Sequence, residues 1–310
     1  MRGYLSPSTV VRLLGHRWDA GIVSLLDRHD PEQPLAGSSP VLPEPCRVDL
    51  DVPFASDLFD ELFAARLAPV EVDVLAERLG LAGAQLVGFR RMFTEQPPSP
   101  YELNLTGDVR MRLFGHASVL LDFGGFTIMT DPVVGCDGDG FDPHYSIADL
   151  PETIDVVVLG RSQSDPFSLE TLLQLRRRIG VIVVGRASGH GLTEVSMRNM
   201  LEHNGFTGVV ELADLQTIEI GPARITAVPV LGKDGGVDTG TMMVPLVRLG
   251  GRVFMFATDA APLTKEADDF VSADIDQVDV MFKRREYTDA ATSLLYSTAE
   301  RFWPVRDEAE

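Results

Sequence analysis

Residues 109–131 read VRMRLFGHASVLLDFGGFTIMTD, and residues 154–160 read IDVVVLG. Each run is short, rich in β-branched and aromatic residues, and closed by Gly or Asp, which is typical of β-strands. Similar runs continue to about residue 282, and helical patterns interrupt them at roughly 168–178 and 192–204. The alternation predicts an α/β domain in which helices cover β-sheets and the functional site lies at strand ends.

The first hundred residues have a different pattern. Apolar residues at mixed three- and four-residue spacings predict an amphipathic helix over 7–27, and further helices are predicted at roughly 54–67, 70–80 and 82–93. Three prolines in EQPPSPY, residues 95–101, cannot continue a helix, so we place a boundary there. The predicted organisation is a helical N-terminal unit, 1–100, followed by a second domain, 101–310.

Composition limits the function classes. With 27 basic against 46 acidic residues, the net charge of −19 disfavours a broad nucleic-acid or anionic-membrane surface. An anionic ligand would therefore need a locally basic pocket. Two cysteines are too few for a disulfide framework, and no apolar run is long enough to span a bilayer, so we expect a cytoplasmic protein without membrane or nucleic-acid partners.

Gly115-His116-Ala117 ahead of the strand run at 118–131, followed by DLPETIDVVVLG, resembles the opening of the metallo-β-lactamase fold. The resemblance runs from about Val109 to at least Tyr296. It is closest to the branch in which a dinuclear metal serves oxygenases and hydrolases of bacterial specialised metabolism, and the N-terminal unit resembles the end of a longer leader domain found there. This resemblance implies an αββα sandwich preceded by a small helical N-terminal unit.

The same resemblance implies metal ligands in the order H-x-H-x-D-H directly after residues 154–160. This chain has Arg161-Ser162-Gln163-Ser164-Asp165-Pro166 instead, so only the Asp remains. The next ligand position holds Lys233, and Asp259 matches a bridging Asp, while Asp131 matches an outer residue of the site. None of the histidines occupies a ligand position: His16, His29, His116, His144, His190 and His203.

Two carboxylates are too few for a dinuclear centre, so the sequence predicts a degenerate, metal-free site without a cofactor. In this interpretation Arg161 and Lys233 neutralise Asp165 and Asp259 through salt bridges. The run Lys283–Arg285 would add positive charge at the rim and favour a carboxylate or phosphate ligand, although a solvated basic face remains an alternative. The predicted ligand-binding residues are Arg284, Arg285, His116, Gln163 and Glu286.

Three functions remain open from the sequence. The first is a metal-free pseudoenzyme that binds a small-molecule or carrier-linked anionic ligand, as an accessory protein in specialised metabolism. The second is a metal-independent enzyme that uses Arg161 and Lys233 with Asp165 or Asp259 as catalytic groups. The third is a regulatory partner of a metal-bearing paralogue, as a mixed dimer, with a homodimer as the simpler assembly. Serine catalysis and phosphate-binding glycine loops lack their sequence motifs.

Overall fold

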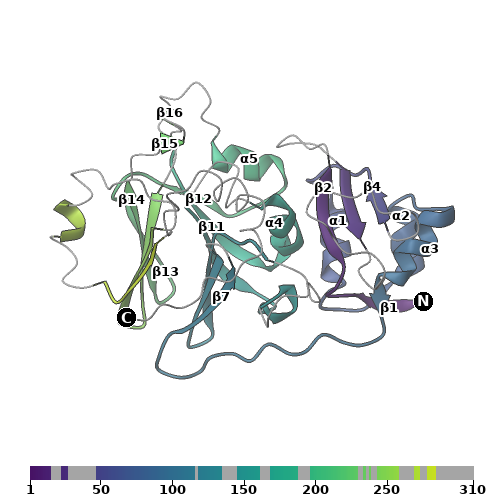
Figure 1. Cartoon of the computed structure of the whole chain (residues 1–310), viewed down its shortest axis with the longest axis horizontal. Coiled ribbons are helices and arrows are strands. Elements are labelled where there is room, and N and C mark those ends of the chain that lie inside the picture. Colours follow the sequence, from purple (N-terminus) through teal and green to yellow (C-terminus); the bar gives the residue numbers. More distant parts are fainter. Residues whose placement is uncertain are drawn as a thin grey trace, which may run out of the picture.

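The computed structural model describes residues 1–14, 22–26, 47–115, 118–134, 145–160, 168–187, 196–229, 233–234, 237–238, 243–257, 269–272 and 278–283. Two stacked β-sheets with helices α4 and α5 occupy one part of the molecule, and the N-terminal strands and helices α1–α3 lie beside them (Figure 1). The predicted αββα sandwich with an N-terminal unit is confirmed.

The first sheet has six strands in the order β12-β11-β10-β9-β8-β7. Strands β7, β8 and β9 pair antiparallel through short turns, whereas β9, β10, β11 and β12 are parallel. Helices α4 and α5 belong to the crossovers that parallel strands require. The bounds are β7 Arg110–Gly115, β8 Ser118–Phe123, β9 Phe126–Thr130, β10 Ile154–Leu159, β11 Ile179–Gly185, β12 Val209–Leu212, α4 Leu169–Leu175 and α5 Met197–His203.

The second sheet has five strands in the order β13-β14-β17-β18-β19. Its pairs are antiparallel except β18 with β19, which run parallel. The bounds are β13 Thr217–Ile220, β14 Ala223–Pro229, β17 Met243–Leu249, β18 Arg252–Ala257 and β19 Val280–Lys283, and a separate ladder joins β15 Lys233–Asp234 to β16 Val237–Asp238.

The period-two alternation of the strands builds the layers. Val156 and Val158 of β10 point into the core between the two sheets, where they join Ile225 and Phe254 of the second sheet. Val157 lies on the opposite face, in the core that contains α4 and α5. Because both faces of β10 are buried, its sequence is continuously apolar rather than alternating.

The helices begin at side-chain caps that the sequence supplies. Ser168 accepts a hydrogen bond from the Thr171 amide at the start of α4, and Ser196 accepts one from the Asn199 amide at the start of α5. These contacts satisfy amides that have no partner inside the helix. They fix where each crossover chain turns from loop into helix.

The N-terminal unit combines helices with two small antiparallel sheets. Helices α1 (Asp57–Ala64), α2 (Val72–Arg78) and α3 (Gly83–Arg91) confirm the predicted helices at 54–67, 70–80 and 82–93. The sheets have the orders β5-β1-β6 and β2-β3-β4. Their strands are β1 Arg2–Leu5, β2 Val10–Leu14, β3 Ile22–Leu26, β4 Arg47–Leu50, β5 Val70–Glu71 and β6 Phe93–Thr94.

The helix predicted over residues 7–27 is wrong, because the described parts of this segment are strands β2 and β3. They pair antiparallel, with Val11 opposite Leu25 and Leu13 opposite Val23. These four side chains are buried, whereas Arg12 and Leu26 are partly exposed and Ile22 is exposed. The apolar residues fit a helical spacing as well, but their β-branched content favours the pleated arrangement once β4 provides a third strand.

The N-terminal unit packs directly against the sandwich. One continuous apolar core contains Phe59 and Leu62 of α1, Leu172 of α4 and Leu120 of β8. The segment between the units is fixed where Tyr101 Oη donates to Asp122 Oδ2 over 2.9 Å and Arg110 pairs with the same carboxylate over 2.8 Å. The domain boundary near residues 95–101 stays a prediction.

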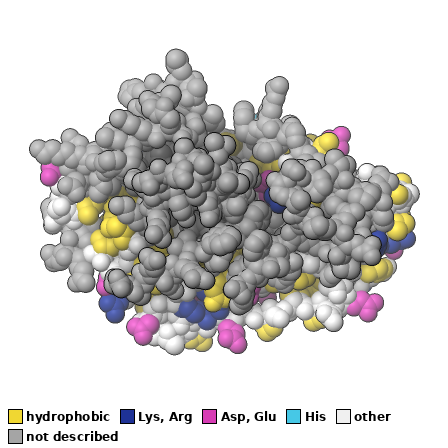
Figure 2. Space-filling view, in the orientation of Figure 1, with side chains coloured by type: hydrophobic (Ala, Val, Ile, Leu, Met, Phe, Trp, Pro, Cys, Tyr) yellow, Lys and Arg dark blue, Asp and Glu magenta, His cyan; other side chains and the backbone are white. Residues whose placement is uncertain are grey.

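Charged side chains are mixed on the visible surface. On the face shown in Figure 2, basic and acidic side chains are interspersed along the lower edge. Within the described residues, no helix combines the length and the apolar character needed to cross a membrane.

Gly180, at the start of β11, provides a test of the parallel pairing with β10. A Cβ at this position would lie 2.7 Å from the carbonyl oxygen of Asp155. We expect Gly180→Ala to lower the free energy of unfolding by about 1–3 kcal/mol, since the strands must separate to admit the methyl group. Urea denaturation measures this loss. Gly107→Ala is the matched control, because a methyl group added there would have no neighbouring atom within 4 Å; equal losses in both variants would contradict the close approach.

Candidate functional site

The strands that precede the predicted site residues end at one edge of the sandwich. Strand β10 ends at Leu159, just before 161–167, and β18 ends at Ala257, just before Asp259. The two sheets meet here, because the amide of Met243 at the start of β17 donates to the carbonyl of Gly160 over 3.0 Å. The sequence order and the strand topology therefore converge on this edge.

Further strands end at the same edge. In the parallel pair β18–β19, Ala257 is opposite Lys283, so the chain that continues to Arg284 and Arg285 leaves beside the chain that continues to Asp259. Gly115 of β7 is opposite Ser118 of β8, and His116 lies between them in the sequence. Lys233 lies in the backbone ladder β15–β16, opposite Asp238.

Apart from the backbone of Lys233, the predicted site residues lie outside the described residues. This applies to Arg161, Gln163, Asp165, Asp259, Arg284, Arg285, Glu286 and His116. The salt bridges expected among Arg161, Lys233, Asp165 and Asp259 therefore stay predictions. The structure describes instead the framework from which these residues continue.

Asp131 is the described acidic residue of this framework. It follows β9, is 4% exposed, and adopts a positive φ of 36°. Its Oδ1 accepts a hydrogen bond from the Gly160 amide over 2.8 Å, and its own amide donates to the Val158 carbonyl over 2.9 Å. The side chain thus ties the end of β9 to the end of β10, immediately before residues 161–167.

Gly160 is required for this approach. A Cβ there would lie 3.1 Å from the carbonyl oxygen of Met243 and 3.3 Å from Oδ2 of Asp131. The sequence predicts Gly160 only as the residue that closes a strand and does not reveal its contact with Asp131. The available signal was that both residues directly follow strands that could be expected to pair.

Residues that follow several neighbouring strands can place their side chains near one another at this edge, next to Asp131. Parallel strand ends are a common location for ligands in α/β proteins, because neighbouring loops diverge there. Within the described residues, no group of three or more His, Cys, Asp or Glu side chains could hold a metal ion.

Two family models match the chain. Residues 16–97 match the diiron non-heme beta-hydroxylase N-terminal domain, and residues 127–299 match the beta-lactamase superfamily domain. The first match includes strands β3–β6 and helices α1–α3, and the second covers most of the sandwich. Both agree with the resemblance drawn from the sequence.

The chain is also similar to a named enzyme. It is 32% identical over 252 residues to the 4-amino-L-phenylalanyl CmlP peptidyl-carrier-protein 3-hydroxylase of Streptomyces venezuelae, covering 80% of this chain and 47% of the relative. The crystal structure of CmlA, a diiron beta-hydroxylase from the same organism, matches 90% of this chain and 52% of that chain at 30% identity, with a TM-score of 0.74. The chain spans about half the length of these relatives.

These relatives correct the predicted function. Proteins similar to this chain along most of its length are named as hydroxylases, so the prediction of a metal-free pseudoenzyme with a degenerate metal site is contradicted. The alternatives drawn from the same premise, the metal-independent enzyme and the regulatory partner, are set aside with it.

Proposed function

This chain belongs to the β-lactamase superfamily, and from that premise we propose that it is an enzyme of bacterial specialised metabolism that modifies a substrate held as a thioester on a carrier protein. The observation that carries the proposal is one continuous similarity, over 80% of this chain, to a hydroxylase whose substrate is an aminoacyl group on a peptidyl carrier protein. The similarity includes both the N-terminal unit and the sandwich, so it is more specific than a shared fold.

The arrangement of the strand ends supports this proposal. A carrier-linked substrate arrives on a long phosphopantetheine arm, so its site must be open at one end and must accept a phosphate. In the sequence, Arg161 follows β10, Arg284 and Arg285 follow β19, and Lys233 lies in β15. In this proposal the cations near the end of β19 bind the phosphate of the arm, because guanidinium groups form paired hydrogen bonds with phosphate oxygens.

The test presents the purified chain with 4-amino-L-phenylalanyl and L-phenylalanyl thioesters on a peptidyl carrier protein. We expect saturable binding by calorimetry and a change in the mass of the tethered acyl group, with the free amino acids unchanged. Reactions are run with and without added ferrous iron, reductant and oxygen. Neither binding nor a mass change with any tethered substrate would contradict the proposal.

Two variants test whether Arg285 contacts the loaded carrier protein. Arg285→Ala is expected to weaken binding of the loaded carrier protein by about tenfold, as the loss of one charged hydrogen-bonding group predicts. Arg78→Ala is the matched control, since Arg78 is exposed on α2 and pairs there with Glu61. Equal weakening by both substitutions would indicate a nonspecific charge effect and remove Arg285 from the site.

A further inference from the structure

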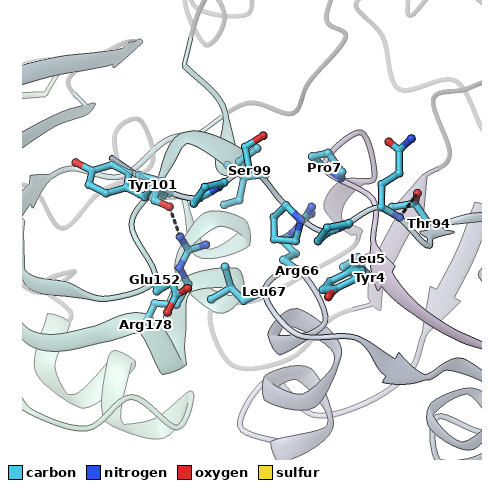
Figure 3. Close-up of a pocket in the computed structure, with 17 residues that line it drawn as sticks. Tyr4, Leu5, Pro7, Arg66, Leu67, Thr94, Ser99, Tyr101, Glu152 and Arg178 are labelled. Carbon is cyan, nitrogen blue, oxygen red and sulfur yellow. Dashed lines mark hydrogen bonds between the residues drawn. The ribbon is translucent and has the colours of Figure 1, made fainter. Parts of the chain in front are cut away.

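A cavity of about 400 Å³ lies between the N-terminal unit and the sandwich. Tyr4, Arg66 and Leu67 line it from the N-terminal side, and Glu152 and Arg178 line it from the sandwich (Figure 3). The proline-rich segment before Tyr101 forms another wall. The cavity is therefore built from three parts of the chain that are distant in sequence.

The cavity is separate from the strand-end edge, the edge of the sandwich at which β9, β10, β18 and β19 end. Arg178 immediately precedes β11, and Glu152 lies shortly before the start of β10. Both residues thus lie at the amino ends of parallel strands, whereas Asp131 and Gly160 lie at the carboxyl ends of β9 and β10. A ligand in the cavity would occupy the opposite edge of the six-stranded sheet.

Arg178 is a buried cation held by neutral groups. Its residue is 7% exposed, and its Nε and Nη2 donate to the carbonyl oxygens of Pro151 and Leu150 over 3.1 and 2.8 Å. Among the described residues, no carboxylate lies within ion-pairing distance of its guanidinium. Burial, followed by the charge of Arg66, lowers the pKa of Arg178 to about 10, so the group remains charged at neutral pH.

Arg66 brings a second buried guanidinium to the same cavity. It is 6% exposed; its Nη1 donates to the Ser6 carbonyl over 2.9 Å, and its Nη2 donates to the Thr9 carbonyl over 3.0 Å and to Gln174 Oε1 over 2.7 Å. Glu152, which is exposed, opposes the repulsion between the two arginines, but its influence on Arg178 is smaller than that of Arg66.

We propose that this cavity binds an oxyanion, a phosphate or carboxylate group of a small molecule, between Arg66 and Arg178. An anion offsets the repulsion between two neighbouring cations. The contacts of Arg178 with Pro151 and Leu150 use its Nε and Nη2 and leave Nη1 as a charged donor for the oxygens of a ligand. The cavity is larger than a single oxyanion, and its proline and tyrosine walls suit an apolar body attached to it. The proposal does not depend on the function proposed for the strand-end edge.

Calorimetry at constant ionic strength tests the site with three probes: inorganic phosphate, pantetheine 4′-phosphate and malonate. We expect saturable binding of one equivalent of at least one probe. Binding of the phosphate probes alone identifies a phosphoryl ligand, and binding of malonate alone identifies a carboxylate ligand. If none of the three binds saturably, the proposal is wrong.

Two variants separate the site from nonspecific attraction. Arg178→Met is expected to weaken binding by at least about tenfold, since it removes one of the two cations. Because Arg178 also holds two carbonyls, this variant can lose stability, so Ser99→Glu provides an independent measurement. Ser99 lines the cavity and is exposed, and a carboxylate there would compete with the ligand while leaving both arginines in place.

Ser99→Gln is the matched control, because it adds a side chain of similar size without charge. We expect its affinity to stay within about twofold of the unmodified chain, while Ser99→Glu loses at least about tenfold. Equal affinities in the Glu and Gln variants would overturn the proposal, whatever the result for Arg178→Met.

Discussion

Arg176→Met is expected to lower the free energy of unfolding by about 3–5 kcal/mol, the range observed when one partner of a buried ion pair is removed. The Arg176 side chain is 4% exposed, and its Nε pairs with Oδ1 of Asp60 over 2.7 Å. Its Nη1 donates to the carbonyls of Phe54 and Asn204 over 2.5 and 2.7 Å, and its Nη2 donates to that of Ser56 over 2.8 Å. Urea denaturation followed by circular dichroism measures the loss.

The large loss of stability expected for Arg176→Met follows from the positions of the groups that Arg176 binds. Asp60, Phe54 and Ser56 belong to the N-terminal unit, whereas Arg176 follows α4 and Asn204 follows α5. One guanidinium therefore joins the unit to two helices of the sandwich. Methionine keeps much of the apolar stem but leaves buried oxygens without donors, which costs more than the packing it preserves.

The neighbouring residue provides the control for Arg176→Met. Arg177 Nε pairs with the other oxygen of Asp60 over 2.8 Å, but the Arg177 side chain is 67% exposed. We expect Arg177→Met to cost less than about 1 kcal/mol, because solvent screens an exposed pair. Similar losses in the two variants would show that the buried hydrogen bonds of Arg176 contribute little.

The strands of the sandwich could be predicted because their sequences are locally consistent. Runs such as IDVVVLG and RVFMFATD are apolar, β-branched or aromatic, and bounded by turn residues, and they match β10 and β18. Strand β13, at Thr217–Ile220, was not predicted. It is an edge strand of the second sheet, and none of its residues is fully buried, so its hydrophobic signal is weak.

Residues 7–27 show the opposite case, in which local spacing is ambiguous. Val10, Leu14 and Ile22 fit one face of a helix, yet they belong to paired strands. The third strand of that sheet, Arg47–Leu50, is distant in sequence, so no local window contains the contact that favours the sheet. Tertiary pairing decides such segments when local propensity does not.

The candidate site could be located from the sequence only in part. The strand ends themselves could be predicted, because a Gly or Asp after many of the apolar runs marks where the chain leaves the sheet. The buried arginines between the N-terminal unit and the sandwich could not be found in this way. Arg176, Arg177 and Arg178 are consecutive in sequence, and only the fold distinguishes two buried side chains from one that is exposed.

Asp131→Ala is expected to lower the free energy of unfolding by about 2–4 kcal/mol. The substitution removes the oxygen that accepts the Gly160 amide, which costs about 1–3 kcal/mol for a buried donor. It also leaves alanine at a φ of 36°, a conformation that Asp and Asn adopt more readily than alanine because their short polar side chains can hydrogen-bond locally. Urea denaturation measures the total, and hydrogen exchange reports the Gly160 amide itself.

Asp131→Asn is the informative companion variant. Asparagine retains Oδ1 and tolerates positive φ, so we expect a loss below about 1 kcal/mol and a Gly160 amide that stays protected. If Asp131→Ala leaves that amide protected as well, Asp131 does not join the ends of β9 and β10. If protection is lost only in the alanine variant, the hydrogen bond from Gly160 sets the position from which residues 161–167 begin. Any ligand that these residues hold at the strand-end edge then depends on Asp131 for its placement.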